Sequence, residues 1–151
     1  MAQLIQPILD TFKLLLESMD ESVLGALPAF VEVKSAGVNF NFPFAAVEPG
    51  RTVFDLSQDQ SRAQGHAVVI QVGVSGSDPE RLKRDCVAYA QAVDAAIAAW
   101  PQTQWPATPV AGMNVKAVNV ASIEYSSTYA SQGGLARFVD LTCTVEVEEW
   151  S

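Results

Sequence analysis

The segment from Phe138 to Glu148 alternates between apolar and polar residues almost without interruption. Successive side chains of a β-strand point to opposite faces of its sheet, so this pattern predicts one face on a core and one face in water. The apolar set is Val139, Leu141, Cys143, Val145 and Val147, and the polar set is Asp140, Thr142, Thr144, Glu146 and Glu148. The polar set holds three acids and no base. The strand therefore requires a sheet that is covered on one side and acidic on the other.

Two segments have the period of an amphipathic helix and could supply that cover. Residues 3–19 place apolar side chains at steps of three and four, which forms one broad apolar face. The second helix begins within residues 77–80, with the sequence Ser-Asp-Pro-Glu. Either the serine caps it with the glutamate as its partner, or the aspartate caps it with the proline at the first helical position. We expect this helix to run to about Ala99 and to lie along the sheet.

Further strands are predicted from β-branched residues and alternation. Residues 67–74 are rich in valine and isoleucine, which favours a strand. Residues 115–125 alternate, with Ala117 and Asn119 expected on one side and Val118 and Val120 on the other. Residues 30–34 and 38–42 could form two short strands, the second one at an edge or strand end because Pro43 follows it.

The remaining segments are expected to be connections. Pro49-Gly50 is expected to be a turn, and Arg51–Gly65 is polar enough to be a loop. At about 15 residues this loop is longer than normal connections, which makes it either functional or disordered. Residues 100–114 form another predicted loop, and residues 126–135 form a turn with two adjacent glycines.

The order of elements predicts an α+β fold in a single domain over residues 1–151. We expect an antiparallel or mixed sheet of about four to six strands, with the N-terminal helix and the long helix packed on one face. The other face of the sheet is left open.

Composition limits the partners of this chain. Its formal net charge is −8 and its pI is near 4.4, so it should repel nucleic-acid phosphates and anionic membranes. Hydrophobic residues make up 49% and charged residues 17%, which leaves apolar surface to cover and suits a subunit of an assembly. No apolar stretch approaches the roughly 20 residues of a membrane span, and no signal peptide is recognised. We expect assembly in a cytoplasm.

Residues that could carry catalysis or bind a metal are few. The single histidine, His66, has no neighbouring nucleophile or carboxylate that would complete a catalytic set. Cys86 and Cys143 fall on apolar faces and are interpreted as reduced core residues, although a disulfide between them is possible. One histidine and two separated cysteines do not form a zinc pattern. We therefore expect no enzyme, no cofactor and no metal.

With these elements placed, the chain resembles the tail terminator, or tail completion, proteins of long-tailed bacteriophages. The resemblance lies in the order and spacing of elements: an amphipathic N-terminal helix, residues 44–50, a long polar segment, the strand at 67–72, the capped helix, and two long closing strands over 115–125 and 137–149. It covers nearly the whole chain. The stretch over residues 20–48 fits the pattern least.

The resemblance implies a structural protein of the virion. Such proteins form hexameric rings that cap the last ring of the tail tube, stop its polymerisation, and join the tail to the neck or head-completion proteins. DNA passes through the lumen without specific binding. The resemblance implies that Asp140, Glu146 and Glu148 face this lumen, where fixed negative charge would keep DNA from adhering.

A ring also needs subunit contacts that close by rotation. The candidates for these contacts are Phe40, Phe42, Phe44, Val53, Phe54 and Trp105. The three phenylalanines have two interpretations: they fill the core of the subunit, or they form an arm that packs on a neighbour. Two other functions remain open, namely another neck or tail-tube subunit, and a small ligand-binding domain or enzyme.

Overall fold

The computed structural model describes residues 5–34, 41–55, 61–131 and 134–150. The described part of the chain contains three α-helices and one mixed six-stranded sheet, so the predicted α+β fold is confirmed. The helices are α1 (Ile5–Glu17), α2 (Glu21–Leu24) and α3 (Pro79–Ala99), with a 3₁₀ turn at Gln102–Gln104. The strands are β1 (Glu32–Lys34), β2 (Phe44–Asp55), β3 (Ser61–Gly76), β4 (Met113–Tyr125), β5 (Tyr129–Ser131) and β6 (Gly134–Trp150).

The sheet is organised around its last strand. The strand order is β1-β2-β3-β6-β4, and β5 also pairs with β6. β6 pairs antiparallel with β3 at every position from Leu135–Gly76 to Trp150–Ser61. All other pairs are antiparallel except β1 with β2. The four long strands therefore alternate in direction across the sheet.

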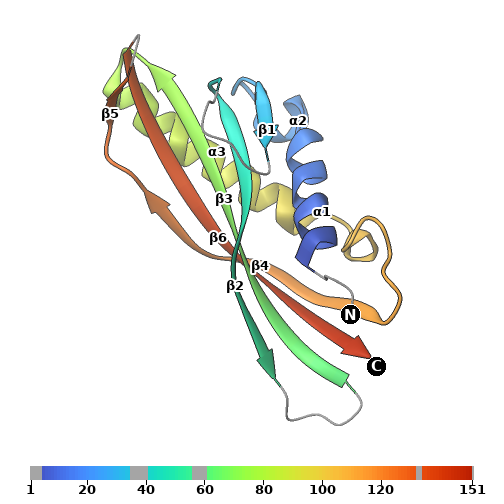
Figure 1. Cartoon of the computed structure of the whole chain (residues 1–151). Coiled ribbons are helices and arrows are strands. Elements are labelled where there is room, and N and C mark those ends of the chain that lie inside the picture. The colour runs from blue at the N-terminus through green and yellow to red at the C-terminus, as the bar shows by residue number, and fades with distance from the viewer. Residues whose placement is uncertain (1–4, 35–40, 56–60, 132–133, 151) are drawn as a thin grey trace.

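The helices cover one face of this sheet (Figure 1). The five apolar residues predicted to face the core from β6 are each at most 1% exposed. From α1, Ile8, Phe12, Leu15 and Leu16 are equally buried, and α3 contributes Leu82, Cys86, Tyr89 and Val93. Apolar burial on this face is the main force that holds helices and sheet together.

The N-terminus of α3 settles the choice between the two predicted caps. Asp78 is the capping residue, because its Oδ1 accepts a hydrogen bond of 3.1 Å from the backbone N–H of Glu80. Pro79 takes the first helical position, where its missing N–H costs nothing. At the other end Trp100 leaves the helical conformation directly before Pro101.

The turn and loop predicted over residues 49–65 are wrong for residues 49–55 and 61–65, and residues 56–60 lie outside the described residues. β2 continues through Pro49 and Gly50 to Asp55, and β3 already begins at Ser61, so most of the predicted loop is paired strand. The strands accommodate the Pro-Gly pair by a shift in register between Pro49 and Thr52, and proline is tolerated in a sheet at such irregularities. The predicted strand over residues 38–42 lies partly outside the described residues, and β2 begins only at Phe44.

The predicted alternation of β4 is also wrong. Register shifts lie between Val115 and Ala117 and between Val120 and Ser122. Val118 and Val120 then pair with Val145 and Cys143 and pack on the core. The first irregularity thus reverses the faces that a strict period of two assigns, and the second restores them at Ile123. The predicted turn at 126–135 contains the short strand β5.

Candidate assembly surfaces

Acidic side chains gather on the sheet face opposite the helices. Asp140, Glu146 and Glu148 lie on this face because β6 buries the residues between them. Strand pairing places two more acids on this face. Glu124 of β4 pairs with Asp140. Glu48 of β2 pairs with Val69 of β3, which in turn pairs with Thr142 of β6. We call these five residues the acidic face: Glu48, Glu124, Asp140, Glu146 and Glu148. Sequence analysis identified three of them, and the other two required knowledge of strand pairing.

Two of the five carboxylates contact a side chain of the same subunit. The Nζ of Lys116 lies 3.0 Å from the Oε2 of Glu148, and the Nε2 of Gln71 donates a hydrogen bond of 3.1 Å to the Oδ1 of Asp140. Glu146, Glu124 and Glu48 are exposed. The acidic face therefore has a net negative charge.

One end of the same sheet face is apolar. Phe42, Phe44 and Phe138 lie with their ring centroids between 5.4 and 6.1 Å apart, and Tyr129 lies 5.9 Å from Phe138. The ring of Phe44 lies against Gly73 on the neighbouring strand, where the absence of a side chain leaves room for it. The face is therefore not uniformly open: an aromatic cluster of Phe42, Phe44, Tyr129 and Phe138 covers one end.

The candidate interface residues occupy three different settings. Phe44 and Trp105 are buried within the subunit, at 0% and 6% exposed. Trp105 packs on Phe12 with 4.8 Å between ring centroids, so its side chain belongs to the core. Phe42 is half-buried in the aromatic cluster, and Phe40 lies outside the described residues. For Phe42 and Phe44, internal packing is the interpretation that fits their contacts.

Val53 and Phe54 remain on the surface. They are 54% and 49% exposed and lie at the end of β2, in the part of the β2–β3 hairpin that extends beyond the helices (Figure 1). Phe54 pairs with Gln64 and Val53 with Gly65. Because Gln64 is buried on the helix side of the sheet, Phe54 faces that side and Val53 faces the acidic side.

A chain of hydrogen bonds crosses the sheet near this hairpin, and sequence analysis missed it. The Nδ1 of His66 lies 2.9 Å from the hydroxyl of Thr52, and its Nε2 lies 3.0 Å from the Oε1 of Gln64. The Nε2 of Gln64 donates to the carboxylate of Glu149 at 2.5 Å. No local sequence signal could reveal this chain, because its members come from three strands.

The hydrogen-bond chain fixes the state of His66. A glutamine oxygen only accepts, so the Nε2 of His66 carries the proton and its Nδ1 accepts from Thr52. His66 is 4% exposed, and burial lowers the pKa of the imidazole below its ordinary value. The ring is therefore neutral at pH 7. Both ring nitrogens form hydrogen bonds, and the one to Thr52 helps to fix the register of β2 against β3.

The two cysteines are buried and unpaired. Burial raises the pKa of the Cys86 thiol to about 11 and that of the Cys143 thiol to about 12, so neither forms a thiolate readily. Within residues 5–34, 41–55, 61–131 and 134–150, no three metal-ligating side chains come together. None of the helices in this part of the chain is long and apolar enough to cross a membrane.

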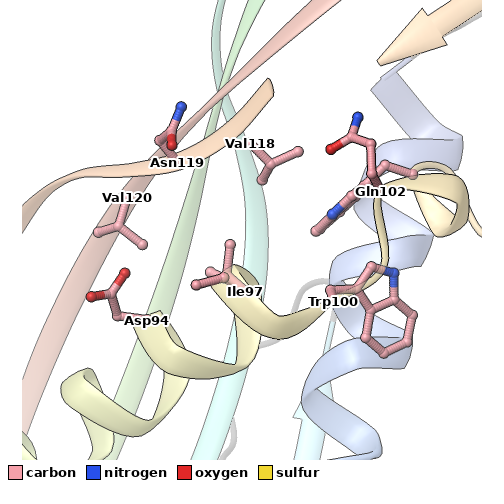
Figure 2. Close-up of a pocket in the computed structure, with 9 residues that line it drawn as sticks. Asp94, Ile97, Trp100, Gln102, Val118, Asn119 and Val120 are labelled. Carbon is pink, nitrogen blue, oxygen red and sulfur yellow. The ribbon is translucent and has the colours of Figure 1, made fainter. Parts of the chain in front are cut away.

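A groove lies on the helix side of the sheet, between α3 and β4 (Figure 2). Its volume is about 370 Å³. Ile97 from the helix and Val118 and Val120 from the strand line its apolar part, and Asp94 points across it toward Val120. Gln102 lies at the other end. This groove could not be predicted from the sequence, because the bulges of β4 decide which of its residues line it.

The sequence matches no protein-family model and no curated protein. Among solved structures, the chain is similar to a chain in a structure described as the virion of a native gene transfer agent (GTA) particle. The TM-score is 0.52 and the sequence identity is 15%, and the similarity covers 98% of this chain and 99% of that chain. The two chains therefore share one fold over essentially their whole length.

Proposed function

We propose that this chain is a structural protein of a virion. It forms a ring at the head-proximal end of a phage tail, where it terminates tail-tube polymerisation and joins the tail to the neck. The observation that carries the proposal is the acidic face, which lies on the side of the sheet away from the helices in a fold shared with a virion chain.

The charge of this face suits a lumen through which DNA slides. Fixed carboxylates repel the phosphate backbone, so the duplex passes without adhering to the wall. Asp140, Glu146 and Glu148 supply this charge from one strand, and Glu48 and Glu124 extend it to strands on either side. A hydrogen bond from Gln71 orients Asp140, and an ion pair with Lys116 orients Glu148.

The chemistry of the buried groups supports a structural role over an enzymatic one. His66 uses both ring nitrogens in hydrogen bonds inside the sheet. Burial raises the pKa of both thiols. These groups, which could otherwise act as a base or as nucleophiles, are engaged in packing.

The assembly state tests the proposal first. Light scattering on the purified chain should give the mass of a closed oligomer, with six subunits expected, and negative-stain images should show rings. Added to purified tail tubes, the rings should cap the tube ends and stop growth. Elongation of the tubes would instead identify a tube subunit, and a strict monomer at high concentration would contradict the proposal.

The role of the charge is tested by reversing it. Rings that carry Glu146→Lys and Glu148→Lys should fold and assemble but should retain DNA in a gel-shift assay at low salt, because the lumen then attracts phosphates. A matched control with Glu17→Lys and Glu80→Lys changes the net charge equally on exposed helix positions. Equal DNA retention by the two variants would contradict a lumen-facing position of the acidic face.

A further inference from the structure

The groove between α3 and β4 opens at an unpaired edge of the sheet. β4 pairs with β6 along one side, and no described strand pairs with its other side. Val118, Val120 and Ile123 pack on the core but stay half-buried. A free strand edge next to an apolar groove is the arrangement by which proteins accept an extended segment of a partner.

The opposite edge of the sheet offers such a segment. β1 pairs only with Phe44–Ala46 of β2, so the rest of β2 has no described strand on its outer side. The end of β2 presents an exposed aromatic ring at Phe54. Within one chain Phe54 cannot reach the groove, because β3 and β6 lie between β2 and β4.

The faces and directions of the two edges agree. Phe54 projects to the helix side of its sheet, and the groove lies on the helix side of β4. β2 runs antiparallel to β4 in the subunit, so a neighbouring β2 in the same orientation would continue the antiparallel sheet.

The two edges come to the same level after a stagger along the strands. Through its pairs, Phe54 lies level with Val115 of β4, beyond Val118 and Val120 of the groove. A stagger of two to four residues, about 7–13 Å, places Phe54 at the level of the groove. Staggers of this kind accompany the closure of sheets into barrels.

We propose that the groove receives Phe54 of a second copy of this chain. The contact is heterologous, since each subunit offers its β2 edge to one neighbour and its groove to the other, and repetition by rotation closes a ring. This inference rests on the proposed ring and identifies the surfaces that build it.

Cysteine crosslinking tests the contact in the assembled protein. The double variant Phe54→Cys with Val118→Cys places one thiol on the tip and one in the groove, while the native cysteines are buried. Mild oxidation should give a ladder of covalent oligomers on a denaturing gel. Two controls move one thiol to the acidic side: Val53→Cys with Val118→Cys, and Phe54→Cys with Asn119→Cys. Neither control should give a ladder.

Rings that form without a ladder, or controls that crosslink as well as the test pair, would overturn the groove contact and leave the proposed function standing. A monomeric native chain would remove both.

Discussion

The contact between Phe44 and Gly73 allows a sharp prediction about the sheet. A methyl group built on Gly73 would lie 2.2 Å from Cε1 of Phe44 and 2.7 Å from its Cζ. Phe44 is fully buried and is held by Phe42 and Phe138 in the aromatic cluster. The ring therefore has little space into which it can move, and Gly73→Ala must displace it or separate two strands.

The expected cost follows from this overlap. Forcing extra atoms into a packed region costs about 1–3 kcal/mol, so we expect Gly73→Ala to lower the free energy of unfolding by about 2 kcal/mol or more. For a chain of this length, that corresponds to a fall in the melting temperature of about 4–8 °C. Urea unfolding followed by circular dichroism at one fixed protein concentration measures the change, because assembly makes stability depend on concentration.

Gly65 provides the matched control. It lies on the same strand and the same sheet face, and a methyl group built on it meets nothing within 4 Å. Gly65→Ala should be neutral or stabilise by about 0.5–1 kcal/mol, since alanine loses less backbone entropy on folding. If the two variants unfold within about 0.5 kcal/mol of each other, the packing argument is refuted. Adding Phe44→Leu should recover part of the loss caused by Gly73→Ala.

Three further predictions concern buried groups. Burial lowers the pKa of His66 below its ordinary value of 6.5. The contribution of the neutral ring to stability should therefore be complete above about pH 6.5 and lost as the pH falls through the folded pKa. Urea midpoints measured between pH 5.5 and 7.5 should fall toward the acid end, and His66→Gln should remove this pH dependence. A slope that survives this substitution would assign the pH dependence to other groups. The thiols of Cys86 and Cys143, with pKa values raised to about 11 and 12, should not react with a thiol reagent at pH 8 in the native protein, whereas both should react in urea; fast native reaction would contradict their burial. Trp105→Ala should lower the free energy of unfolding by about 3–5 kcal/mol, because Trp105 packs on Phe12 in the core; a stable subunit that only fails to assemble would place Trp105 at an interface instead.

Local signals in the sequence were enough to predict several elements. Residues 78–80 mark the start of α3 by a capping aspartate and a proline, both of which act within one turn. The alternation of β6 is complete because one of its faces lies under helices and the other does not. These features depend on neighbours in sequence or on a single buried face, and sequence analysis recognises both.

Features that depend on pairing between distant strands could not be predicted. The Pro49-Gly50 pair is an ordinary turn signal, but pairing of β2 with β3 carries it into a strand through a change of register. The polar residues around His66 gave the impression of a loop, although their side chains satisfy one another across three strands. The groove depends on bulges in β4, which have no distinct sequence signal.

The position of β6 in the sheet has a consequence for folding kinetics. β6 comes after β4 in the chain but lies between β3 and β4, so both strands lack this neighbour until it inserts. Its pairs with β3 join residues at least 59 positions apart, as for Gly76 and Leu135. Such distant pairing slows folding, because the chain loses conformational entropy on closing the long loop before the new contacts compensate for this loss. We therefore expect slow refolding in which β3 and β4 gain protection from hydrogen exchange at the same time, when β6 enters between them.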